Sequence, residues 1–325
     1  MKIQVLKNSK ILVNSANKKF EIHPLWLRER AKTENLVDKN NDQRLYDPSQ
    51  LNKNLKIKKA SMYNGSLDIE FTDGVKFKYE VEDLIYELDK KEPLQKLILW
   101  NGKFKKRPIV TFKENIFEEK LMYDVLQDFY KYGFVIFKNV PTEDNYVLKF
   151  ANSMGTVRPT NFGESFSVKS IPKPNDLAYT SFALTPHTDN PYRKPVPCIQ
   201  LLHCLENEVN GGLSTLVDGF AVATYLKKRN KDLFKILTQT KVRFRFVDTS
   251  TILENWGELI ELDENKNIKQ VRYSTRLDYV PALEKNKLEK FYKARKLLSN
   301  LYASPKFEMR FKLEKGDLIM MDNHR

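Results

Sequence analysis

Apolar and polar residues alternate along two early segments of the chain, which predicts β-strands joined by tight turns. Residues 3–13 (IQVLKNSKILV) alternate on both sides of an Asn-Ser pair, and residues 67–79 (LDIEFTDGVKFKY) alternate on both sides of an Asp-Gly pair. An Asp-Gly pair between two such runs is a strong hairpin signal. The polar stretch between the two segments reads as a loop. We therefore expect a small, mostly β unit over residues 1–100.

From about residue 105 the pattern combines helical and extended periods. Residues 114–133 carry apolar side chains at helical spacing and end at a glycine, and residues 283–302 form a second amphipathic pattern. Strands are expected within residues 134–140, 240–250, 269–275 and 307–323. Many short strands with peripheral helices favour a β-sandwich or barrel core over residues 105–325.

Composition narrows the class of protein. Of the 325 residues, 41% are hydrophobic and 12% aromatic, which is typical of a folded globular chain. The net charge is +14, but no run of five or six lysines occurs and acidic residues are interleaved, so a solvated surface is favoured over a nucleic-acid patch. The two cysteines cannot form a disulfide framework. No apolar stretch reaches the length of a membrane span, and we expect a cytoplasmic protein.

The stretch 185–195 (TPHTDNPYRKP) places His187 and Asp189 two residues apart in a chain with only four histidines. Alternate residues of an extended segment point to the same side, so the imidazole and the carboxylate can face one point in space. These groups are two of the three ligands in the 2-His-1-carboxylate site that holds Fe(II). By itself the pair is also compatible with two hydrogen-bonded loop residues.

The surrounding segments form a more specific arrangement. They are LAYT (177–180), HTD (187–189), QLLHC (200–204), GG-x-S (211–214), VDGF (217–220) and GD-x-x-x-x-DN-x-R (316–325). Together they resemble the Fe(II)- and 2-oxoglutarate-dependent dioxygenases of the taurine-dioxygenase superfamily, and within it the γ-butyrobetaine and trimethyllysine hydroxylase branch. The segment HPLWLRERA (23–31) is similar to the small domain that precedes the catalytic domain in this branch.

The resemblance implies a mainly β fold with peripheral helices. It predicts a double-stranded β-helix, or jelly roll, over residues 105–325, preceded by a small β-rich N-terminal domain over residues 1–100. It also implies Fe(II) as the cofactor, with 2-oxoglutarate and O2 as co-substrates.

The resemblance assigns roles to individual residues. His187 and Asp189 become iron ligands. Ser214 matches the hydroxyl that contacts a carboxylate of 2-oxoglutarate, and Leu202 matches a residue of the same pocket. An ordinary turn hydroxyl is an equally good interpretation of Ser214. His203 is not a ligand in this pattern and is expected on the opposite side of its strand from Leu202, as a packed histidine.

A trimethylammonium group forms no ordinary hydrogen bond, and proteins hold it against aromatic faces through cation–π attraction of about 0.5–2 kcal/mol per contact. The resemblance places an aromatic cage at Phe162, Phe166 and Tyr179, with core packing as the alternative for any one of them. Asp176 lies where this branch distinguishes its substrates and would favour a cationic or amino-bearing molecule, unless it only forms a turn. Candidates for the anionic end of the substrate are Asn190, Tyr192 and Arg276.

The sequence departs from the family pattern at both ends. The N-terminal unit contains no cysteine and only His23 as a zinc-type ligand, so we expect no structural zinc there. The chain stops at MMDNHR, whereas the family pattern places the second histidine ligand a few residues later and the 2-oxoglutarate arginine beyond it. We therefore expect the third iron ligand beyond Arg325 and a jelly roll truncated at its C-terminus. His324 occupies a variable position of the motif and is interpreted as an ordinary strand histidine.

The leading hypothesis is an oxygenase that hydroxylates a small quaternary ammonium acid, as in carnitine biosynthesis. γ-Butyrobetaine is the first candidate substrate, followed by trimethyllysine or a trimethylammonio-phosphonate. The alternative from another class is a non-catalytic betaine-binding homologue, and a nucleic-acid binder is a distant third. We expect a small-molecule partner, no nucleic acid and no membrane, and a homodimer is compatible with the resemblance.

Overall fold

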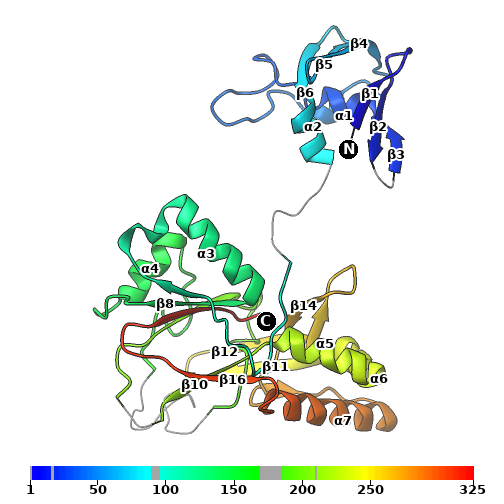
Figure 1. The fold of residues 1–325 in the computed structure, drawn as a ribbon. Helices are drawn as coiled ribbons and strands as arrows, with labels where there is room; N and C mark the ends of the chain where they lie inside the picture. Colours follow the sequence, from blue (N-terminus) through cyan, green and yellow to red (C-terminus); the bar gives the residue numbers. More distant parts are fainter. Residues whose placement is uncertain (1, 16–17, 89–95, 169–183, 209–210) are drawn as a thin grey trace. The chain divides into compact units, whose positions relative to one another are not determined.

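The computed structural model describes residues 2–15, 18–88, 96–168, 184–208 and 211–325. They form two compact units, Met1–Pro93 and Leu94–Arg325, which are described separately (Figure 1).

The described residues of the first unit contain two antiparallel three-stranded sheets, ordered β1-β2-β3 and β4-β5-β6. The elements are β1 (Lys2–Val5), β2 (Ile11–Ser15), β3 (Lys18–Glu21), α1 (Pro24–Arg28), η1 (Pro48–Gln50), β4 (Ile57–Tyr63), β5 (Ser66–Phe71), β6 (Lys76–Glu80) and α2 (Val81–Leu88). Both predicted hairpins are confirmed, because β1 pairs with β2 and β5 pairs with β6. The apolar faces of both sheets meet in one core with Leu27 of α1.

The HPLWLRERA segment holds this first unit together. His23 caps α1, since its Nδ1 accepts a hydrogen bond from the backbone N–H of Leu25 at 3.2 Å. Arg28 is buried and its Nε donates to Asp73 Oδ2 at 2.7 Å, which ties α1 to the turn between β5 and β6. The buried Tyr79 hydroxyl donates to the Leu27 carbonyl at 2.6 Å. These contacts give the segment a structural role.

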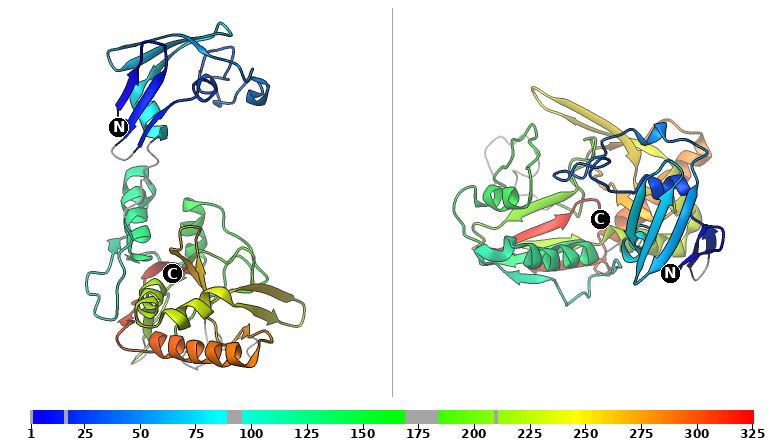
Figure 2. Two further views of the ribbon diagram at one scale, coloured as in Figure 1. Left: turned by 90° about the vertical axis from the view of Figure 1, so that its right-hand side faces the viewer. Right: turned by 90° about the horizontal axis from the view of Figure 1, so that it is seen from above.

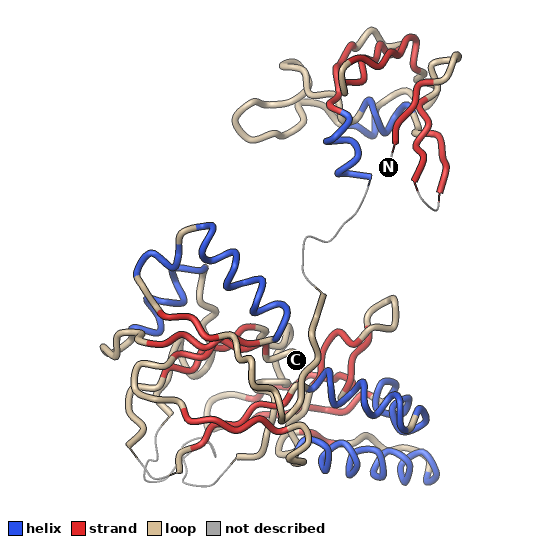
Figure 3. The backbone as a smooth tube through the Cα atoms, in the orientation of Figure 1, coloured by secondary structure: helices blue, strands red, loops and turns tan. Residues whose placement is uncertain are grey.

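The second unit combines short strands with helices that flank them (Figure 3). Its elements up to the middle of the unit are β7 (Ile109–Thr111), η2 (Glu114–Phe117), α3 (Glu119–Tyr132), β8 (Phe134–Lys138), α4 (Tyr146–Met154), β9 (Ile199–His203), β10 (Leu213–Val217), α5 (Gly219–Arg229) and α6 (Lys231–Gln239). The remaining elements are β11 (Lys241–Val247), β12 (Ile252–Glu258), β13 (Ile260–Leu262), β14 (Ile268–Val271), β15 (Asp278–Tyr279), α7 (Lys285–Tyr302), β16 (Glu308–Lys312) and β17 (Leu318–Asp322).

In the described part of this unit the strands form a four-stranded sheet β7-β8-β17-β9, a three-stranded sheet β12-β11-β15, and the pairs β10-β16 and β13-β14. One face of the four-stranded sheet packs against α3 and α4 through a core that contains Phe137, Phe150 and Met320. Its other face meets β16 through a second core that contains Phe134, Phe311 and Ile319. Helices α5, α6 and α7 lie side by side and cover a third core (Figure 2).

Two expected elements differ in detail. The helical pattern at residues 114–133 is split into the 3-10 helix η2 and the α-helix α3, which ends at Gly133 with φ of 80°. The strand–turn–strand segment 307–323 forms both strands, β16 and β17, but they do not pair with each other. β16 pairs with β10, and β17 pairs with β8 and β9. This segment therefore connects two sheets.

Candidate metal and co-substrate site

The His-x-Asp loop brings its two side chains together. His187 Nε2 lies 3.3 Å from Asp189 Oδ1, and both residues are half-buried. Two ligand atoms that each lie about 2.1 Å from a metal ion and at right angles to each other are about 3.0 Å apart. The observed separation is close to this value, so the pair fits adjacent corners of one coordination sphere.

Neighbouring groups select which atoms of the pair face a metal. His187 Nδ1 lies 2.8 Å from the Thr185 carbonyl oxygen, which can only accept, so in the neutral ring Nδ1 carries the proton and the lone pair falls on Nε2. Gln200 Nε2 donates to Asp189 Oδ2 at 2.6 Å and leaves Oδ1 turned toward His187. Metal-binding histidines and carboxylates are usually oriented by such outer hydrogen bonds. Nε2 and Oδ1 are therefore the two atoms that could bind a metal here.

His187 and Asp189 shift each other's pKa, so that each favours the charged form of the other. Burial alone would lower the pKa of His187, but Asp189 and the Thr185 carbonyl raise it above its ordinary value. Burial alone would raise the pKa of Asp189, but His187, Gln200 and the positive charge of Arg276 hold it below its usual range. Asp189 is thus a carboxylate prepared to bind a cation.

The loop is fixed from two sides by hydrogen bonds. Thr188, which is buried, donates its backbone N–H to the Tyr273 carbonyl at 2.8 Å and accepts the Tyr273 N–H on its hydroxyl at 2.9 Å. The Asn323 amide oxygen accepts from the Asp189 N–H at 2.7 Å. The Asn323 NH2 group donates to the carbonyls of Asp189 and Pro197 at 2.9 and 2.8 Å. Asn323 therefore joins Asp189 to Pro197, which comes just before β9.

Replacing Asn323 with alanine is expected to weaken binding of Fe(II) or Co(II) to the full-length protein about 10–100-fold, because the backbone of Asp189 loses the two hydrogen bonds that position this residue. The change also removes three hydrogen bonds and should cost about 3 kcal/mol of the free energy of unfolding. Calorimetric metal titration and urea unfolding measure the two effects. Asn286→Ala, on an exposed position of α7, is the matched control and should change neither quantity. Unchanged metal affinity in Asn323→Ala would contradict the positioning role.

The proposed co-substrate residues lie on strands that face each other across the two sheets. On β9, Leu202 shares its face with Gln200, the residue that holds Asp189, because alternate strand residues point the same way. On β10, Ser214 is paired with Phe311 of β16, whose ring belongs to the core between the sheets. Leu202 is 38% exposed, so the described residues leave part of its surface free for a ligand.

An aromatic group lies next to the His-x-Asp loop. The Phe162 ring meets Phe246 of β11 edge-on with centroids 5.4 Å apart, and Phe166 lies 5.8 Å from Phe162. Tyr192, three residues after Asp189, stacks on Phe246 at 5.1 Å. Phe246 and Tyr192 are buried, whereas Phe166 is exposed. Of these rings, Phe162 and Phe166 keep accessible surface.

The remaining predicted substrate residues fall in different settings. Tyr179 and Asp176 lie outside the described residues. The Tyr192 hydroxyl donates to the Asn190 side chain, and Asn190 has a left-handed backbone with φ of 53°. Arg276 is exposed, and its charge lowers the pKa of both His187 and Asp189, which places it near the pair. Whether these side chains contact a substrate stays a prediction.

The two other histidines of this unit lie apart from the pair. His203 on β9 is half-buried, and burial lowers its pKa, with a weaker opposing effect of the Val140 backbone. His324 Nε2 lies 3.1 Å from the Val196 carbonyl. Among the described residues, His324 groups with Cys198 and Asp322 and not with the His-x-Asp pair. A third ligand beyond Arg325 stays a prediction.

Sequence reasoning missed three residues of this site: Gln200, Asn323 and Phe246. Gln200 and Asn323 were seen only as parts of the QLLHC and DN-x-R motifs. Phe246 carried one available signal, since residues 241–247 alternate and place Phe244 and Phe246 on one face.

Comparison with known families gives one match that spans most of the chain. The model described as "Taurine catabolism dioxygenase TauD, TfdA family" matches residues 93–325.

Similar proteins include two kinds of dioxygenase. Mitochondrial trimethyllysine dioxygenase of Rattus norvegicus is 28% identical over 317 residues, which span 93% of this chain and 74% of the relative. Human γ-butyrobetaine dioxygenase is 30% identical over 222 residues, 67% of this chain and 57% of the relative. The γ-butyrobetaine dioxygenase of Pseudomonas sp. (strain AK-1) is 33% identical over 193 residues, 59% of this chain and 50% of the relative.

Solved structures show the same kind of fold. A putative α-ketoglutarate-dependent taurine dioxygenase from Burkholderia xenovorans has a TM-score of 0.50 at 17% identity and covers 70% of this chain and 83% of its own. AAD-2 in complex with Mn(II) and N-oxalylglycine also has a TM-score of 0.50, at 16% identity, and covers 70% of this chain and 88% of its own. In the described part of the chain, no helix is both long and apolar enough to cross a membrane.

Proposed function

Because the chain belongs to the TauD, TfdA family of 2-oxoglutarate-dependent dioxygenases, we propose that it hydroxylates a small acid that carries a trimethylammonium group. γ-Butyrobetaine is the first candidate, and trimethyllysine has equal support from the relatives. A trimethylammonio-phosphonate is the third candidate. The observation that carries the proposal is the aromatic group in which the accessible rings of Phe162 and Phe166 pack together and Phe162 packs on Phe246, which in turn stacks on Tyr192, three residues after Asp189.

The residues present fit the cofactor and co-substrate of this family. His187 Nε2 and Asp189 Oδ1 would hold Fe(II), which suits two cis ligands of one nitrogen and one oxygen. When bound with 2-oxoglutarate, the iron supplies the oxygen chemistry that converts the co-substrate to succinate and CO2 and hydroxylates a C–H bond. Ser214 and Leu202 would contact 2-oxoglutarate between the two sheets. Gln200 would keep the Asp189 carboxylate in position during the reaction through its hydrogen bond to Oδ2.

Substrate orientation would come from the two ends of the substrate molecule. Aromatic faces attract a quaternary ammonium group without hydrogen bonds, by about 0.5–2 kcal/mol per contact. Phe162 is half-buried and Phe166 is exposed, so both rings retain accessible surface. Arg276 carries the positive charge that would attract the substrate carboxylate.

The jelly-roll assignment belongs to the same proposal. We infer a double-stranded β-helix over residues 105–325, with the sheet β7-β8-β17-β9 facing β10-β16, and a small β-rich domain over residues 1–100. The common core of Phe134, Phe311 and Ile319 between the facing strands supports the first assignment. The separate core of the first unit supports the second.

Succinate release from 2-oxoglutarate by the full-length protein, measured over a panel of betaines, tests the function. We expect turnover with γ-butyrobetaine or trimethyllysine. We expect little turnover with the dimethylamino or tert-butyl analogues, and the tert-butyl analogue lacks the positive charge that aromatic faces attract. Turnover with taurine but with none of the trimethylammonium acids would overturn the substrate class.

A cage variant sharpens this test. Phe162→Leu should raise KM for the trimethylammonium substrate about 2–30-fold, the equivalent of one lost cation–π contact, while Phe117→Leu, in a different core, should leave KM unchanged. Betaine binding without any succinate release, and unaffected by chelator, would favour the non-catalytic binding protein instead.

A further inference from the structure

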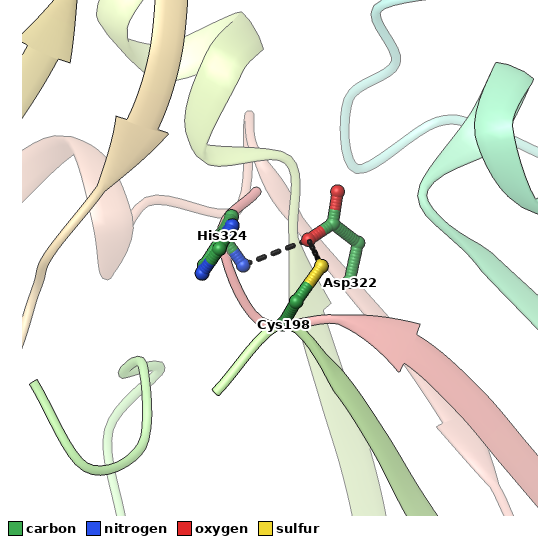
Figure 4. A group of neighbouring side chains, drawn as sticks. All are labelled: Cys198, Asp322 and His324. Atoms are coloured by element: carbon green, nitrogen blue, oxygen red, sulfur yellow. Dashed lines mark hydrogen bonds between the residues drawn. The ribbon is translucent and has the colours of Figure 1, made fainter. Parts of the chain in front are cut away.

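A second group of metal-binding side chains lies at the start of β9 and the end of β17. Cys198, Asp322 and His324 each offer one ligand atom, and these atoms lie within 4.8 Å of one another. Figure 4 shows the three side chains converging from the two neighbouring strands. No residue of the His-x-Asp pair belongs to this group.

The distances suit a tetrahedral site. Cys198 Sγ lies 3.8 Å from Asp322 Oδ1. A thiolate about 2.3 Å from zinc and a carboxylate oxygen about 2.0–2.2 Å from it are about 3.5 Å apart at the tetrahedral angle. A small side-chain movement closes the difference, and Cys198 is exposed and free to make it.

The histidine is held in the form that a metal ligand needs. His324 Nε2 lies 3.1 Å from the Val196 carbonyl oxygen, which can only accept, so Nε2 carries the proton of the neutral ring. The lone pair then falls on Nδ1. A ligating histidine that donates its other N–H to a backbone carbonyl is the usual arrangement around zinc. Asp322 Oδ1 also accepts from the His324 backbone N–H at 2.8 Å, which ties the carboxylate to the backbone of His324.

We propose that Cys198 Sγ, an Asp322 carboxylate oxygen and His324 Nδ1 form a binding site for a borderline divalent cation of the zinc type, separate from the iron pair. A thiolate, an imidazole and a carboxylate are the donor set that zinc prefers, and exposure of Cys198 leaves the fourth position to water. Asn323 lies between the two C-terminal ligands and holds Asp189.

Cadmium titration of iron-free, full-length protein tests the site, because a Cd(II)–thiolate bond gives a charge-transfer absorption in the ultraviolet. We expect one equivalent of Cd(II) to produce the band, and Zn(II) to displace it. Cys198→Ser should abolish the band, and His324→Ala should weaken the affinity at least about tenfold. The matched control is Cys204→Ser, because Cys204 is the other thiol and donates to the Leu313 carbonyl; it should keep the band.

The His187→Ala variant separates this proposal from the proposed function. It should retain the cadmium band, since its iron pair is not part of the group. Loss of the band in His187→Ala or in Cys204→Ser, or full cadmium affinity in His324→Ala, would overturn the site. Asp322→Asn keeps the oxygen that accepts from the His324 N–H, and its thermal unfolding checks that a lost affinity reflects the ligand and not the fold.

Discussion

Replacing His187 with alanine in the full-length protein is expected to lower succinate release from 2-oxoglutarate more than about 100-fold. Loss of a group that only supports a metal ligand costs about 10–100-fold, and loss of the ligand itself should cost more. The variant leaves Asp189 as the remaining ligand of the described pair, and it also removes the neighbour that lowers the pKa of this carboxyl. Succinate formation at saturating Fe(II), together with metal affinity, measures the effect.

His203→Ala is the matched control for this prediction. His203 is half-buried on β9 with a lowered pKa, and it faces away from Leu202. Its loss should leave metal affinity unchanged. Retained turnover in His187→Ala would refute the iron assignment, and equal loss in both variants would show that the effect comes from the fold.

Short-range sequence patterns predicted the part of the site that depends on local geometry. The two-residue spacing predicted that His187 and Asp189 face one point, and the structure places their donor atoms 3.3 Å apart. Alternation likewise separated Leu202 from His203 on β9. The roles of these residues as metal ligands or co-substrate contacts stay predictions. Residue spacing determines to which side a side chain points, but not whether a metal or co-substrate binds there.

Contacts between distant segments were beyond the reach of such patterns. Asn323 meets Asp189 across 134 residues, and nothing in the local sequence indicates that its amide pairs with the backbone of the metal loop. Phe246 on β11 reaches Phe162, which lies in a turn much earlier in the chain. The pairing of β16 with β10 instead of β17 is of the same kind, since a strand–turn–strand pattern does not say which neighbours the strands choose.

The VDGF and DN-x-R motifs show how a recognisable pattern can have a structural cause. Asp218 and Arg325 form a buried two-point ion pair, with Nη2 to Oδ2 at 2.7 Å and Nε to Oδ1 at 3.1 Å. Asp218 also accepts from the N–H groups of Phe220 and Ala221 at the start of α5 and from Trp100. Gly219 has no room for a side chain, because a Cβ would lie 2.6 Å from the Arg325 carbonyl oxygen. These contacts join residues around Trp100, α5 and the end of β17.

Asp218→Asn is expected to destabilise the protein by about 3–5 kcal/mol, because it leaves the Arg325 charge buried without its partner. The side chains of Arg325 and Asp218 are 3% and 0% exposed, so water cannot replace the lost carboxylate. The asparagine keeps an oxygen that can cap α5, which separates the charge effect from the cap. Urea unfolding measures the loss, and Lys269→Gln, which breaks an exposed ion pair with Glu261, should cost less than about 1 kcal/mol. A loss in Asp218→Asn no larger than this control would mean that the pair contributes no more than a surface ion pair, and the two motifs would then need a functional explanation.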